Sequence, residues 1–219
     1  MKSLGITFVF LIALSGFSQE EKEKFLIEKG QWNLETDLNI NLAERESSFG
    51  VDSENDTFSF EIQPKLGYFI SDNLVLGLGL GYGYSNSEFM SANSESLITG
   101  TTNTFSITPY VKKFFPISQN LAIQLQAETR YSKSKTDNES QFNPDDSETR
   151  TILIGLRPGL AYRISDSILL QGNFGLLSYQ NRKVEFDSQE GNISSEDKLS
   201  SFGLNLSSTN IFLGLSILL

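Results

Sequence analysis

Apolar and polar residues alternate along most of this chain with a period of two. The pattern is clearest from Thr57 to Ser85, where one alternating run ends at Ile70 and, after the polar residues 71–73, a second run begins at Leu74. Successive side chains leave a β-strand on opposite sides, so each run indicates a strand with one apolar and one polar face. This stretch therefore predicts a β-hairpin with a short turn.

The same periodicity predicts eight strands in total. We expect them over residues 32–43, 57–70, 74–85, 104–115, 121–132, 151–164, 168–179 and 202–219. The connections alternate in length, with short turns at 71–73, 116–120 and 165–167 and long polar loops at 44–56, 86–103, 133–150 and 181–200. The last strand changes parity along its length, which predicts a bulge or break near Ser208-Thr209.

Prolines recur at matching positions ahead of the short turns, at Pro64, Pro109 and Pro158. The repeated pattern predicts that consecutive strands pair as hairpins in a meander. Proline lacks the backbone donor that a sheet needs, so we expect each copy to tolerate one lost ladder bond.

Alternation alone leaves open which face is buried. A soluble β-domain would turn its apolar face inward, whereas a membrane barrel turns it outward to lipid. The alternating loop lengths favour the membrane. The apolar face of the eight predicted strands does so too, because it carries a single charged residue, Lys113. Aromatic residues also gather near both strand ends, as the two interfacial girdles of a membrane barrel require. These are Phe58, Tyr68, Tyr82, Tyr84, Phe105, Phe115, Tyr131 and Tyr162.

Composition removes several classes of function. The 219 residues include 17 Lys and Arg, 27 Asp and Glu, no histidine and no cysteine, giving a formal net charge of -10 at pH 7. Nucleic acid is excluded as a partner because phosphate binding needs clustered basic residues. Without histidine or cysteine there is no Ser-His or Cys-His catalytic pair and no zinc site of the Cys/His type. We predict no enzyme, no cofactor and no metal site.

The N-terminus has the layout of a secretory signal peptide. A short positive start is followed by an apolar run from Leu4 to Leu14 and by small residues before a cut after Ser18. We assign residues 1–18 to the signal peptide, 19–29 to a mobile periplasmic linker and 30–219 to the barrel.

With these features the chain resembles the small outer-membrane β-barrels of the OmpA/OmpX type, and in particular the outer membrane protein β-barrel domain of Bacteroidota. The resemblance implies an all-β, eight-stranded antiparallel up-and-down transmembrane β-barrel in the outer membrane of a Gram-negative bacterium. It also implies contact with outer-membrane lipid and lipopolysaccharide, and insertion by the barrel-assembly machinery. The final strand fits the assembly signal of such barrels through residues 211–219, although Leu219 stands in place of the usual terminal aromatic.

The polar face, which would line the lumen, carries charges of both signs. They form either a structural network that fills a narrow barrel or a gate of ion pairs in a pore. The residues are Glu35, Asp37, Glu61, Lys65, Lys112, Glu128, Arg130, Arg157 and Arg163. On the same face, the glycines at 77, 79, 81 and 83 are expected to leave room for bulky neighbours.

We therefore expect a structural or interaction protein, with four acidic extracellular loops on a plugged barrel and an external ligand at the loops. The alternative is a narrow channel or small-solute transporter, which the charged lumen would suit.

Overall fold

A computed structural model of the chain describes residues 24–47, 53–91, 96–139, 146–187, 195–205 and 212–219. The predicted signal peptide and the predicted bulge near residues 208–209 lie outside these ranges.

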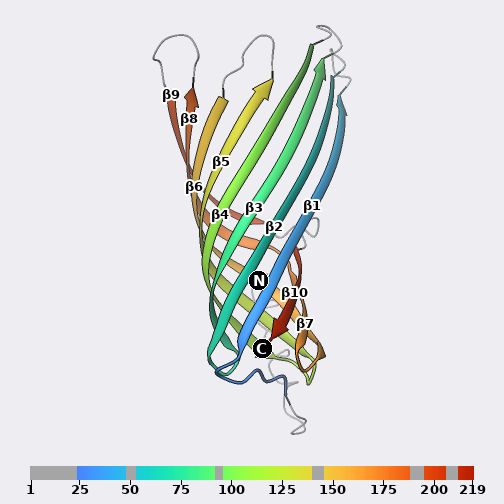
Figure 1. The fold of residues 1–219 in the computed structure, drawn as a ribbon, viewed down its shortest axis with the longest axis vertical. Helices are drawn as coiled ribbons and strands as arrows, with labels where there is room; N and C mark the ends of the chain where they lie inside the picture. Colours follow the sequence, from blue (N-terminus) through green and yellow to red (C-terminus); the bar gives the residue numbers. More distant parts are fainter. Residues whose placement is uncertain (1–23, 48–52, 92–95, 140–145, 188–194, 206–211) are drawn as a thin grey trace, which may run out of the picture.

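The described residues form one antiparallel sheet that closes on itself (Figure 1). Its strands are β1 (Trp32–Ser47), β2 (Ser53–Ser71), β3 (Leu74–Ser91), β4 (Ser96–Pro116), β5 (Leu121–Glu139), β6 (Asp146–Ser165), β7 (Ile168–Asn173), β8 (Leu176–Asp187), β9 (Ser195–Asn205) and β10 (Phe212–Leu218). Strands β1 to β6 pair in sequence, β6 pairs with β7, β7 with β10, and β10 with β1. The predicted eight-stranded up-and-down barrel is confirmed.

The ten segments make eight strands because two strands are interrupted. Both β7 and β8 pair with β6, and β9 pairs with β8 as β10 does with β7. Between β7 and β8, the backbone of Gly175 adopts a φ of 84°, a conformation that glycine reaches without strain. The Phe174 amide there donates to the Pro158 carbonyl at 3.1 Å, so the wall stays connected across the break.

The predicted long loops were wrong over most of their length. The ladder between β3 and β4, for example, continues through Ser87↔Gly100 to Ser91↔Ser96, inside the range predicted as a loop over 86–103. The strands beyond the alternating region are rich in Ser, Thr and Asn on both faces, so they pair without an apolar period. Figure 1 shows these strands rising well above the short β7 and β10.

The three strand prolines behave as predicted. Thr36 pairs with Pro64, Leu78 with Pro109 and Leu125 with Pro158. On the opposite side of Pro64 and Pro109 the ladder skips the proline and the residue before it while keeping its register. Beside Pro158 the neighbouring strand breaks between β7 and β8. Each proline therefore pairs regularly with the strand on one side and interrupts the ladder of hydrogen bonds on the other side.

Burial shows which face is inside. On β3, Leu76, Leu78 and Leu80 expose 50%, 45% and 58% of their surfaces. By contrast, Glu35 and Lys112 are fully buried at 0%. In water this arrangement would expose apolar surface and bury charge, both of which are costly. Against lipid it buries the apolar face, as a membrane barrel requires.

Aromatic side chains mark two levels on the outer surface. Near the short turns, Trp32 and Tyr68 lie with ring centroids 5.0 Å apart, and toward the loops Tyr82 and Phe105 lie 5.1 Å apart. On β4 the stretch from Phe105 to Phe115 joins the two levels, close to the roughly 9–11 residues with which a tilted strand crosses a bilayer. The remainder of β4, Ser96 to Thr104, extends beyond the membrane. At the other level, Lys113 donates to the Asp72 carbonyl at 3.0 Å, so its charge lies beside a turn, as predicted.

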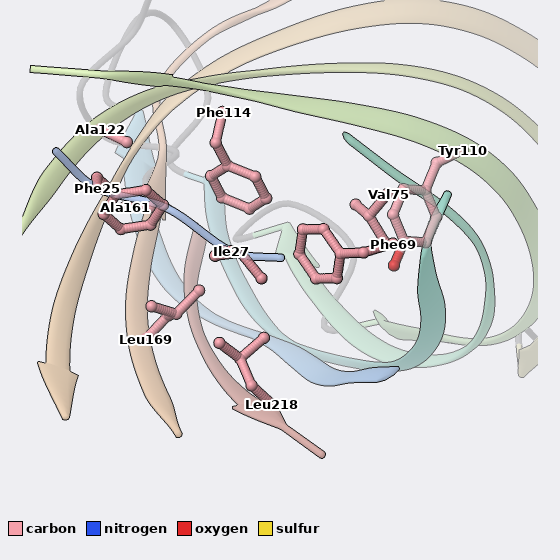
Figure 2. Packing of buried hydrophobic residues seen from close by; sticks show 10 residues of the cluster. All are labelled: Phe25, Ile27, Phe69, Val75, Tyr110, Phe114, Ala122, Ala161, Leu169 and Leu218. Carbon is pink, nitrogen blue, oxygen red and sulfur yellow. The ribbon is translucent and has the colours of Figure 1, made fainter. Parts of the chain in front are cut away.

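The apolar core fills the lumen at the end that carries the short turns. We call it the turn-end cluster, and Figure 2 shows its side chains converging inside the ring of strands. Its members are Phe25, Ile27, Phe69, Val75, Tyr110, Phe114, Ala122, Ala161, Leu169 and Leu218. Phe114 stacks with Phe25 at 5.8 Å and with Phe69 at 6.1 Å between ring centroids.

Two lumen glycines make room for Tyr110. A Cβ atom built on Gly77 would lie 2.5 Å from Cζ of Tyr110 and 2.7 Å from the Leu66 carbonyl oxygen. One built on Gly67 would lie 2.9 Å from the Tyr110 hydroxyl. At Gly83 the nearest atom would be 3.6 Å away, an ordinary contact. The close approach of Tyr110 and of the neighbouring backbone therefore explains why position 77 is a glycine, whereas position 83 has room for a side chain.

The substitution Gly77→Ala should destabilise the barrel by about 1–3 kcal/mol, because the new methyl group overlaps both a buried ring and a backbone oxygen. The matched variant Gly83→Ala should lack this penalty, since its methyl group meets only ordinary contacts. Both changes reduce the freedom of the unfolded chain in the same way. Urea unfolding of each variant in lipid vesicles gives the comparison, and equal losses would contradict the packing argument.

Candidate functional site

The lumen contains the residues that the sequence singled out, and four of them form a buried charge network next to the turn-end cluster. The network consists of Glu35 and Asp37 on β1, Lys65 on β2 and Lys112 on β4. The Glu35 carboxylate accepts from Lys112 at 2.6 Å and from Lys65 at 3.2 Å, and Lys65 also pairs with Asp37. Since β1 and β4 are not neighbours, the Glu35–Lys112 pair crosses the lumen. Two carboxylates and two ammonium groups leave this network without net charge.

Neutral polar groups complete the coordination of Glu35. Gln171 on β7 donates to Glu35 at 3.2 Å and accepts from Lys112 at 2.8 Å, and Asn33 donates to Glu35 at 3.4 Å. All of these side chains are buried. The network therefore joins β1, β2, β4 and β7 through hydrogen bonds inside the barrel.

Two further ion pairs lie outside this network. Arg157 on β6 donates to Glu128 on β5 at 2.8 Å, with both side chains almost fully buried. Nearer the loop end, Arg130 on β5 donates to Glu61 on β2 at 3.1 Å across the lumen, with the Arg130 and Glu61 side chains 19% and 33% exposed. The nine predicted residues thus form three groups and one outlier.

The outlier is Arg163, which lies at the turn end. Its guanidinium carbon sits 4.6 Å from the centroid of the Phe25 ring, and its Nη2 donates to the Leu26 carbonyl. Arg163 therefore contacts the segment that precedes β1 and takes no part in the central charge network.

That segment, residues 24–29, differs from the mobile linker that the sequence predicted. Phe25 and Ile27 are buried to 0% and 1% exposure inside the mouth of the barrel. The Phe25 amide donates to the Ser118 carbonyl at 3.0 Å, and the Lys29 amide donates to Asp72 at 3.0 Å. In Figure 2 the segment crosses the lumen among inward-pointing side chains. Its described part is bound to the barrel at several points.

Asn73 makes three hydrogen bonds to this segment. Its side-chain oxygen accepts from the Ile27 amide at 2.8 Å, its side-chain nitrogen donates to the Phe25 carbonyl at 3.3 Å, and its own amide donates to the Ile27 carbonyl at 2.9 Å. The residue adopts a φ of 59°, which asparagine tolerates better than most residues. The turn after β2 thus presents an asparagine that pairs with the N-terminal segment much as a strand would.

A second set of charges lies beyond the outer aromatic level, on the outward face of β5, β6, β8 and β9. Glu148 pairs with Lys133 at 2.8 Å and with Arg150 at 2.7 Å, and Lys183 pairs with Glu185 at 2.8 Å and with Glu196 at 2.9 Å. Hydrogen bonds from Lys133 and Arg150 lower the pKa of Glu148 below its ordinary value. These exposed pairs tie together strands that have left the membrane.

A metal site is not seen in the described ranges. No group of three or more His, Cys, Asp and Glu side chains there could hold a metal ion. The same ranges contain no helix long and apolar enough to cross a membrane.

A closed hydrogen-bonded ring, an apolar outer surface between two aromatic levels and a polar buried interior define a transmembrane β-barrel. With eight antiparallel strands and short turns at one end, the protein is a small outer-membrane β-barrel of the type found in Gram-negative bacteria. The predicted location in the bacterial outer membrane follows.

Comparison with known proteins finds similar structures but no related sequence. No family model matches the chain. No curated protein matches it either. The structure is similar to Neisserial surface protein A, with a TM-score of 0.43 and 16% identity over 86% of this chain and 99% of that protein. It is also similar to a major outer membrane protein from Thermus thermophilus, with a TM-score of 0.47 and 12% identity over 88% and 100% of the two chains. For the outer membrane protein OprG from Pseudomonas aeruginosa, the TM-score is 0.47 and the identity 9% over 88% and 97%.

Removing one member of the central network should be costly. Lys112→Met leaves Glu35 and Asp37 with only Lys65, and an uncompensated buried charge costs about 3–5 kcal/mol. The double variant Lys112→Met/Glu35→Gln restores charge balance and should recover most of that loss. The free energy of unfolding in lipid vesicles measures both.

The matched control is Lys198→Met, because Lys198 is exposed and its pair with Glu196 lies outside the membrane. Exposed pairs contribute little to stability, so this variant should unfold like the wild type. A loss for Lys112→Met no larger than for Lys198→Met, or a double variant weaker than the single one, would contradict a balanced network.

Proposed function

We propose that the protein is a closed outer-membrane anchor whose extended hairpins form an interaction surface outside the cell. The observation that carries this proposal is the central charge network, in which Glu35 and Lys112 are fully buried and bonded across the lumen. An eight-stranded barrel is just wide enough for its own side chains. Because each charge in the network has a partner, a passing ion would have to separate buried pairs.

The turn end supports the same proposal. Phe25 and Ile27 occupy the lumen among Phe69, Phe114 and Leu169, so apolar side chains fill the barrel below the charge network. A solute entering from the periplasm would meet this cluster first. Two different barriers in series favour a closed barrel over the narrow channel or small-solute transporter that the charged lumen alone would allow.

The interaction role is supported by the length of the strands. β4 and β6 have 21 and 20 residues, about twice what the membrane requires. The ion pairs around Glu148 and Lys183 link the projecting parts of four strands. A protein that served only as a membrane plug would need no such extension, so we place the functional surface on the projecting hairpins.

Planar-bilayer recordings test the closed state. Wild-type protein should show no reproducible conductance steps under conditions in which a general porin does. A variant lacking residues 19–29 should also remain silent, because the charge network closes the lumen independently. Regular steps from the wild type would support the channel and overturn the proposal, and steps only from the truncated form would assign the closure to the N-terminal segment.

Trimming one hairpin tests the interaction surface. Replacing residues 87–100 with Asn-Gly keeps the flanking pair Asn86↔Thr101 and supplies a turn that suits antiparallel strands. The trimmed barrel should insert with unchanged heat-modifiable mobility on gels. Cells carrying it should show the same sensitivity to detergent and chelator as cells lacking the protein. Wild-type resistance would instead place the function in the membrane-spanning part.

A further inference from the structure

The lumen contains a second feature near the loop end, a cavity of about 220 Å³ above the charge network. It lies among β1 to β5 and is bordered by the Glu61–Arg130 pair. We call it the hydroxyl cavity because serine and threonine side chains dominate its lining. These are Ser59, Ser85, Thr102, Thr104, Ser106 and Ser132.

The register of the strands brings these hydroxyls together in rows. Ser59 pairs with Ser85 and Ser85 with Thr102 across β2, β3 and β4, while Ser106 pairs with Ser132 across β4 and β5. Between the rows lies Gly83, where an added Cβ would meet nothing closer than 3.6 Å. Close packing thus does not require a glycine at position 83, and the missing side chain keeps this part of the lumen open.

Several of these polar groups have no partner within the part of the chain that the structure describes. The Thr104 hydroxyl bonds to Ser134 at 2.8 Å and that of Thr102 to Thr136 at 2.9 Å. By contrast, the side chains of Ser59, Ser85 and Ser132 make no hydrogen bond to another residue of the described ranges. Each hydroxyl both donates and accepts, so the cavity offers a set of groups suited to another molecule that does the same.

Charge and size narrow the class of ligand. One carboxylate and one guanidinium border the cavity, so its lining is neutral and favours an uncharged ligand. Glu61 accepts and Arg130 donates, which suits neighbouring hydroxyls on a small ring. The volume is below the roughly 300–1,000 Å³ of sites for drug-sized ligands, and so fits a solute of monosaccharide size.

We propose that the hydroxyl cavity binds a neutral saccharide unit presented at the outer face of the membrane. The unit is either a free sugar or one residue of a surface polysaccharide, since the same hydroxyl chemistry recognises both. This site goes beyond the anchor role and is independent of whether the barrel conducts.

The experiment is ligand-observed NMR on the full-length protein in detergent micelles, with glucose, galactose, mannose and N-acetylglucosamine as probes. At least one should give saturable saturation transfer that a second sugar competes away. Addition of lipopolysaccharide-derived core oligosaccharide separates the two sources, because a polymer-borne unit should displace the free sugar at lower concentration. Binding of glycine betaine or free amino acids in place of any sugar would overturn the assignment of class.

Two variants test the location. Gly83→Leu fills the cavity without removing a polar group, and Glu61→Gln removes the charged acceptor while keeping its shape. Gly83→Leu should abolish sugar binding because its side chain occupies the space of the ligand. Glu61→Gln should weaken binding about tenfold or more, because a lost hydrogen bond to a charged group has an effect of that size. The control is Thr101→Leu, on the same strand as Thr104 but of opposite parity, which should leave binding unchanged.

The outcomes are decisive in both directions. Sugar binding that survives Gly83→Leu in a folded barrel would place the site elsewhere. The absence of saturable binding to every sugar would refute the proposed saccharide site. Heat-modifiable gel mobility confirms that each variant is folded. Conductance recordings remain a separate test, so failure here leaves the closed-anchor proposal standing.

Discussion

The structure depends on one constraint, namely that a backbone crossing lipid must pair all of its N–H and C=O groups within the protein. This chain meets it by closing eight strands into a ring, with β10 pairing to β1 on one side and to β7 on the other. Once the ring is closed, the period of two assigns every second side chain to lipid and the others to the lumen. The apolar outer surface and the polar interior are therefore two consequences of one pairing scheme.

A polar interior then creates its own demand. Charges removed from water need partners, and the small cross-section brings β1, β4 and β7 close enough to supply them. Glu35 illustrates the result, because its contacts with Lys112, Lys65 and Gln171 come from three different strands. Stability of the barrel and the closure that we propose for its lumen thus rest on the same hydrogen bonds. A mutation that opened the lumen here would also weaken the fold.

The sequence predicted the fold where the two faces differ in polarity. The hairpin around residues 57–85 was predicted with its turn and its outward leucines, because lipid demands an apolar residue at every second position. Beyond Tyr84 and Phe105 both faces of the sheet meet water, so the alternation of apolar and polar residues disappears. The sequence of these paired strands therefore looks like that of loops. The partner of Glu35 could not be predicted, since Lys112 lies 77 residues away and the pairing depends on the stagger of strands that are not neighbours.

The prediction of a mobile linker at the N-terminus differs from the structure for another reason. Phe25 and Ile27 do alternate with Leu26 and Glu28, but the run is too short and too charged at its ends to stand out from a linker. Its conformation is fixed by Asn73 and Ser118, which lie on turns and carry no recognisable motif. The signal becomes visible only when one asks which side chains could fill the turn end of the lumen, where Ala122 and Ala161 are too small to do so alone.

The contents of the lumen change in order along the barrel axis, and this order bears on function. Apolar side chains occupy the mouth at the turn end, balanced charges lie beside them, and hydroxyls border an open cavity toward the loop end. A pore would need a continuous polar path, which the turn-end cluster interrupts, whereas a receptor needs a site open to one side and closed behind. This order suits the saccharide site that we propose, because the charge network of Glu35 lies toward the turn end and Gly83 leaves the space toward the loop end unfilled. Even packing from end to end would leave no such space, so the asymmetry of the lumen supports the saccharide site that we propose.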